Sequence, residues 1–122
     1  MNFSRSIIGV LAMLLVFGAA LSSANAADYS PLDCKKASSA AERTICSDYG
    51  LGQSEARVAT LYGLTTSLVA MGQRGTIQDD QRAFLRQRDA CGANAGCLRA
   101  AYAARDKQLE AVMQSIQQRG PF

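Results

Sequence analysis

Four cysteines are the residues of this chain best suited to chemistry, and they follow the spacings C-x11-C and C-x5-C: Cys34, Cys46, Cys91 and Cys97. A thiolate is a nucleophile and a metal ligand, and two thiols can form a disulfide. The chain has no C-x2-C pair and no histidine. A zinc ribbon, a zinc site with imidazole ligands and a thioredoxin-type redox pair therefore do not fit.

An even number of cysteines in an exported protein predicts two disulfides. Three connectivities are open, and we favour the local pairs Cys34–Cys46 and Cys91–Cys97 because each flanks an expected helix boundary. Pairing removes the thiol nucleophiles, and the absence of histidine excludes Ser-His-Asp and Cys-His catalysis. We therefore expect no enzyme: no catalytic residue, no metal and no cofactor.

The first 26 residues predict a secretory signal peptide. Arg5 precedes an uncharged apolar run of 15 residues (7–21), and Ala-Asn-Ala follows at 24–26, so cleavage is expected between Ala26 and Ala27. A membrane span takes about 20 apolar residues, so we expect no stable anchor after cleavage and a periplasmic or secreted protein.

Without Arg5, residues 27–122 hold 12 basic and 10 acidic side chains, a net charge of +2. This balance gives no indication of nucleic-acid binding.

Helix signals begin with a capping box. The Ser39 side chain can accept a hydrogen bond from the Glu42 amide, while the Glu42 carboxylate accepts one from the Ser39 amide. This pattern predicts a short helix through Cys46. Asp48 can cap the next helix. From Val58 onward, apolar residues three and four apart predict that this helix is amphipathic and ends near Met71.

Residues 72–75 (GQRG) predict a turn, because two glycines flank two polar residues. Thr76 would open a third helix with a second capping-box pattern. Asp79 and Asp80 would then lie near its N-terminus, where carboxylates interact favourably with the helix dipole.

The third helix should break at residues 91–92, and Asn94 can cap a fourth helix that Gly120 and Pro121 end. No segment has the alternating pattern of a strand. We therefore predict an all-α fold, a small disulfide-stapled antiparallel bundle of three to four helices in one domain over residues 27–122.

Three stretches resemble the motifs of the LprI-like lysozyme-inhibitor family of bacterial envelope proteins: residues 33–46 (DCKKASSAAERTIC), 81–91 (QRAFLRQRDAC) and 97–105 (CLRAAYAAR). They are similar to D-C-x-K-A-x-[ST]-x-x-E-x-x-I-C, Q-R-x-W-L-x-x-R-D-x-C and C-L-x-x-x-Y-x-x-R. The resemblance runs from about residue 33 to 109. Phe84 departs from it, standing where the family usually has Trp. Ser54-Glu55 replaces the usual Leu-Asp, which predicts looser packing of that helix face.

The resemblance implies a protein that binds a muramidase and blocks its cleft. The shared polar residues could form a binding cluster, but we favour a structural network that joins the helices around the disulfides: Glu42, Arg88, Asp89 and Arg105. For the contact with a lysozyme or another peptidoglycan hydrolase we expect Arg74, in the glycine-flanked turn, or Asn94, in the disulfide-closed loop 92–96. The alternative is a non-catalytic interaction or structural module of the cell envelope, binding another periplasmic protein.

Overall fold

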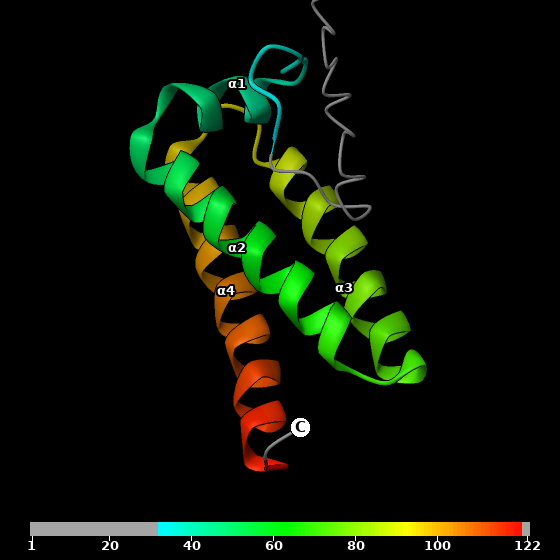
Figure 1. Ribbon diagram of the computed structural model, residues 1–122. Helices are drawn as coiled ribbons and strands as arrows, with labels where there is room; N and C mark the ends of the chain where they lie inside the picture. The colour runs from blue at the N-terminus through cyan, green and yellow to red at the C-terminus, as the bar shows by residue number, and fades with distance from the viewer. Residues whose placement is uncertain (1–31, 121–122) are drawn as a thin grey trace, which may run out of the picture.

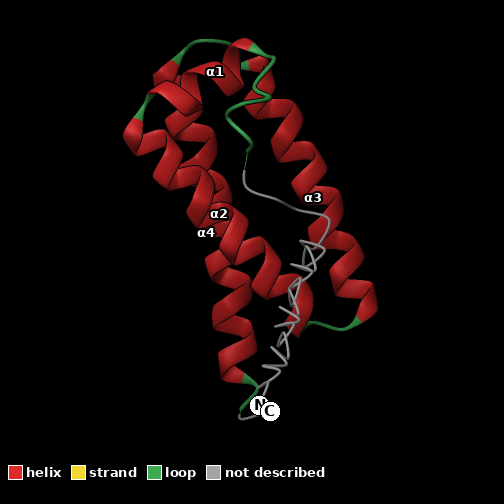
Figure 2. Cartoon of the chain, turned by 45° about the horizontal axis from the view of Figure 1, so that its top comes forward, coloured by secondary structure: helices red, strands yellow, loops and turns green. Residues whose placement is uncertain are grey.

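The computed structural model describes residues 32–120, which form four helices (Figure 1). The helices are α1 (Ala40–Ser47), α2 (Tyr49–Leu68), α3 (Met71–Ala90) and α4 (Ala95–Gln118). No strand occurs within 32–120 (Figure 2), so the predicted all-α fold is confirmed. The predicted signal peptide lies outside the described residues.

Three of the helix starts use the caps that the sequence predicts. Ser39 Oγ accepts from the Glu42 backbone N–H at 3.0 Å, and Glu42 Oε2 accepts from the Ser39 N–H at 3.1 Å. Asp48 Oδ1 accepts from the Leu51 N–H, and Asn94 Oδ1 accepts from the Cys97 N–H, both at 3.0 Å. These bonds satisfy amides that have no acceptor inside their helix.

The long helices pack side by side, with α3 running opposite to α2 and α4, and α1 covers one end of the bundle (Figure 1). The most extensive contact is between α2 and α4. Phe84 and Tyr102 pack edge to face in the core, with ring centroids 5.3 Å apart, and the predicted core position of Tyr102 is confirmed by its burial. Most of the core is aliphatic, and its other large members are Ile45, Leu51, Val58, Ile77, Leu98, Leu109 and Ile116.

The prediction of a turn at residues 72–75 is wrong. The chain reverses at Val69 and Ala70, both extended, and α3 begins at Met71. Val69 is buried in the core, which fixes the turn there, and a Cβ at Gly72 or Gly75 would meet nothing within 4 Å. The two glycines are thus accommodated in the helix, at a cost of about 1 kcal/mol each relative to alanine.

The predicted capping box at residues 76–79 is also wrong, because these residues lie inside α3. Thr76 Oγ1 donates to the carbonyl of Gly72, one turn earlier. Asp79 forms an exposed ion pair with Arg82. Asp79 and Asp80 lie beyond the first turn, where the effect of the helix dipole is small.

Both favoured disulfides are confirmed: Cys34 bonds to Cys46 and Cys91 to Cys97, and no described cysteine is free. Two disulfides are typical of proteins from oxidising compartments. Among residues 32–120, no helix is both long and apolar enough to cross a membrane.

Candidate functional site

The two disulfides lie at the same end of the bundle, which we call the disulfide end. Cys34–Cys46 ties the chain before α1 to the last turn of α1, and Cys91–Cys97 closes the loop from α3 to α4. Helix α1 contacts all three long helices there (Figure 1). Cross-links and packing together make this end the most constrained part of the described chain.

The centre of the disulfide end is Arg88, whose side chain is only 7% exposed. Its Nε and Nη2 donate to Asp89 Oδ1 at 2.9 and 2.8 Å. Nη2 also lies 3.9 Å from Glu42 Oε1, and Nη1 lies 3.8 Å from Glu55 Oε2. One guanidinium therefore joins α1, α2 and α3 through three carboxylates, and we call these four residues the Arg88 cluster.

Burial is the largest single influence on the pKa of Arg88 and would lower it, but hydrogen bonds and charge interactions with Asp89 and Tyr102 together raise that pKa. Tyr102, on α4, donates its hydroxyl to Glu55 Oε2. Burial and this bond raise the pKa of the Tyr102 hydroxyl, so it stays a donor at neutral pH. The cluster thus reaches all four helices.

Arg105 was expected in the same network, but the structure gives it different partners. Its Nε donates to Gln81 Oε1 at 2.9 Å, and its Nη2 donates to the Ile77 carbonyl at 3.1 Å. Gln81 precedes Arg88 by seven residues, about 10 Å along a helix. Arg105 therefore joins α4 to α3 in the middle of the bundle, because its own position on α4 lies two turns beyond Cys97.

Sequence reasoning missed Glu55 as a member of the cluster. The departure at residues 54–55 predicts looser packing, yet Glu55 is only 5% exposed and contacts both Arg88 and Tyr102. Its place between Leu51 and Val58, four and three residues away, puts it on the buried face of α2. The sequence signal that could have identified Glu55 is its position: an acidic residue among the apolar residues of one helix face.

Arg74 does not occupy an exposed turn. It lies in the first turn of α3, half-buried, and its Nε donates to the Thr66 carbonyl at 2.7 Å. Its Nη2 donates to the Val69 carbonyl at 3.4 Å. These carbonyls at the C-terminus of α2 have no intrahelical partner, so Arg74 caps α2 and is not a projecting contact residue.

The loop that carries Asn94 is closed by Cys91–Cys97 as predicted, but it is shorter than the predicted 92–96, because α4 begins at Ala95. Gly92 adopts φ +53°, a left-handed conformation that favours glycine. Ala93 and Asn94 are exposed, and the loop leads directly into the N-terminus of α4. The Asn94 side chain caps α4 by accepting a hydrogen bond from the Cys97 N–H. Any contact of Asn94 with a partner must therefore be made while this hydrogen bond is kept.

Glu42 gives the disulfide end a pH dependence. Hydrogen bonds from the Ser38 and Ser39 amides lower the pKa of its carboxyl below the ordinary value of 4.5. The ionised carboxylate therefore stabilises the folded protein above about pH 4.5, and this stabilisation is lost as the pH falls through the folded-state pKa. We expect Glu42→Gln to cost about 1–2 kcal/mol at pH 7 and to flatten the decline in stability between pH 6 and 3, measured by urea unfolding. Ser39→Ala is the control, since it should cost about 1 kcal/mol but keep the decline. An unchanged acid response in Glu42→Gln would contradict this assignment.

Comparison of the chain with protein-family models, with curated proteins and with solved structures finds no match. Nor do the cysteine and carboxylate side chains of residues 32–120 form a group of three suited to holding a metal ion. The site is therefore described by its own geometry: a doubly cross-linked end with a buried ionic cluster and an exposed loop.

Proposed function

We propose that this chain is an exported, non-catalytic protein of the bacterial envelope that binds a lysozyme-type muramidase and blocks its cleft. The observation that carries the proposal is the exposed loop 92–94, held by Cys91–Cys97 at the most constrained end of the bundle. A loop fixed before binding loses little conformational entropy on binding, which favours insertion into a cleft. The target class comes from the resemblance to the LprI-like family.

The chemistry of the loop supports an acidic target surface. Muramidase clefts contain a pair of carboxylates. The loop leads into a helix of 24 residues, whose first amides lack acceptors within the helix and whose dipole favours negative charge at this end. Asn94 is uncharged, so it introduces no repulsion there.

Inhibition of lysis tests this function. A peptidoglycan suspension is treated with goose-, chicken- or invertebrate-type lysozyme, with and without excess protein of residues 27–122. We expect at least one enzyme to be slowed at micromolar protein. Asn94→Asp should weaken inhibition about tenfold or more, because it places a negative charge against the carboxylates, while aspartate still caps α4.

Met71→Ala is the matched control, because Met71 is 82% exposed at the opposite end of the bundle. Its inhibition should equal that of the parent. If Asn94→Asp inhibits as well as the parent, the loop is not the contact. If no lysozyme is slowed, the inhibitor function is wrong.

One observation favours the second candidate, an interaction module for another envelope protein. Three exposed apolar side chains gather near the turn from α2 to α3: Leu64, Leu68 and Met71. Exposed apolar groups of this kind often mark protein contacts. Under this candidate Met71→Ala, and not Asn94→Asp, would reduce binding to a periplasmic partner.

A further inference from the structure

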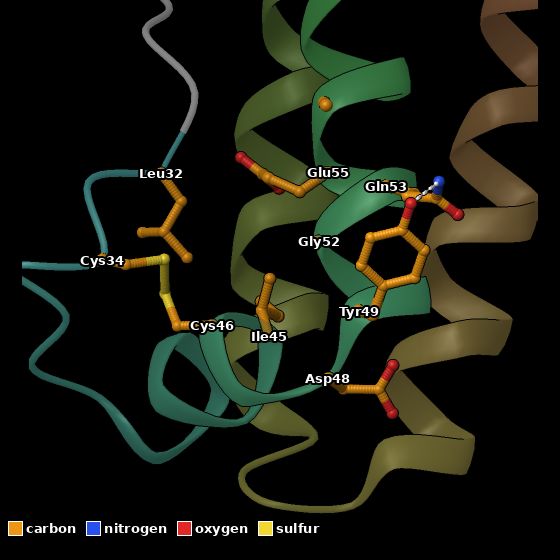
Figure 3. Close-up of a pocket in the computed structure, with 10 residues that line it drawn as sticks. Leu32, Cys34, Ile45, Cys46, Asp48, Tyr49, Gly52, Gln53 and Glu55 are labelled. Atoms are coloured by element: carbon orange, nitrogen blue, oxygen red, sulfur yellow. Dashed lines mark hydrogen bonds between the residues drawn. A yellow bond between two sulfur atoms is a disulfide. The ribbon is translucent and has the colours of Figure 1, made fainter.

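A cavity of about 370 Å³ opens beside the Cys34–Cys46 disulfide. It lies between the chain before α1, α1 itself and the first turns of α2 (Figure 3). Leu32, Ile45 and Glu55 point into it, whereas Asp48 points away (Figure 3). The walls are mainly apolar and include the Cys34–Cys46 disulfide and Ala56.

The charged residues that line the cavity are both acidic, Asp48 and Glu55, and no basic residue lines it. Glu55 belongs to the Arg88 cluster, in which three carboxylates share one guanidinium. Asp48 pairs with Arg99 at 3.2 Å. Glu55 therefore places a carboxylate at the wall of an apolar cavity, where Coulomb interactions are stronger than in water.

Tyr49 stands at the edge of the same cavity and is 83% exposed. Its hydroxyl accepts a hydrogen bond from Gln53 Nε2 at 3.0 Å, which holds the ring over α2 (Figure 3). An exposed aromatic ring attracts a cation at its face. Long basic side chains also have apolar stems that pack on aliphatic walls.

We propose that this cavity receives a lysine or arginine side chain of the target protein, its stem against Leu32 and Ile45 and its charge toward Glu55 and Tyr49. The inference rests on the proposed function and deepens it, because it adds a second contact beside the loop 92–94.

Filling the cavity tests the inference against the intact partner. Gly52 lines the cavity, and a Cβ there would have the Ile45 carbonyl oxygen, at 3.8 Å, as its nearest neighbour, so a side chain can begin at this position and Gly52→Leu is designed to extend into the space. Gly63→Leu is the matched control, since it makes the same change in the same helix with nothing within 4 Å. Both replace a helix glycine and should fold. We expect Gly52→Leu to raise the Kd for lysozyme at least tenfold and Gly63→Leu to leave it within about twofold.

A second arm does not involve lysozyme. Amide NMR spectra of residues 27–122 are recorded with millimolar acetyl-Gly-Arg-Gly-amide, or with the peptide that has norleucine in place of arginine. Only the arginine peptide should shift the signals of Tyr49, Gly52 and Gln53. Equal shifts with norleucine, or none with arginine, would overturn the basic-side-chain assignment.

The two arms separate the failures. If lysozyme binds equally well to Gly52→Leu, the cavity inference is wrong and the proposed function stands. If no lysozyme binds but the arginine peptide does, the cavity inference stands and the muramidase is the wrong target.

Discussion

Replacing Arg88 with methionine is expected to lower the free energy of unfolding by about 3–5 kcal/mol. The change keeps an apolar stem of similar length but removes the guanidinium that pairs with Glu42, Glu55 and Asp89. Two of these carboxylates are largely buried, at 22% and 6% exposure. A carboxylate that loses its cation in such a place is costly. Urea unfolding at pH 7 measures the loss.

Arg82→Met is the control. Arg82 lies on the same helix, but its side chain is 62% exposed and forms an ion pair with the exposed Asp79. Exposed pairs of this kind contribute about 0–1 kcal/mol. If Arg88→Met cost no more than Arg82→Met, the Arg88 cluster would not hold the disulfide end together.

Removal of the Cys34–Cys46 bridge is expected to have the next largest effect. Its cysteines are 12 residues apart, and those of Cys91–Cys97 are 6 apart. In the chain-entropy account, closing these loops stabilises the protein by about 3 and about 2 kcal/mol. Replacing both cysteines of the longer loop by serine should thus lower Tm by roughly 10–20 °C.

Calorimetry of the two double-serine variants checks both the size and the order of these losses. The variant without Cys91 and Cys97 should melt between the parent and the variant without Cys34 and Cys46. Equal melting of all three proteins would contradict a stapling role for the disulfides.

The sequence predicted those parts of the fold that depend on bonds between residues close together along the chain. The caps at Ser39, Asp48 and Asn94 each use a side chain and an amide three residues later, so the sequence alone contains both partners. The disulfides are also short-range. The starts of α1, α2 and α4 and the favoured cysteine pairs were therefore within reach of sequence reasoning.

The errors concern contacts between distant segments. Glycines around Arg74 favour a turn locally, but burial of Val69 and the bonds from Arg74 to the end of α2 place the reversal earlier. The role of Glu55 depends on Arg88 and Tyr102, 33 and 47 residues away along the chain. A pattern read along one helix does not contain these partners.

The candidate site was partly predictable for the same reason. The closed loop before α4 follows from two cysteines and a cap, whereas the cavity beside Cys34–Cys46 is lined by three separate segments. Its apolar and acidic character became visible only when those segments were placed together.

Hydrogen exchange of the protein, alone and saturated with lysozyme, tests most directly whether the disulfide end is the binding surface. We predict slower amide exchange at residues 45–56 and 91–98 in the mixture, and unchanged exchange at residues 64–75. Protection confined to residues 64–75, or no protection anywhere at micromolar lysozyme, would contradict the account.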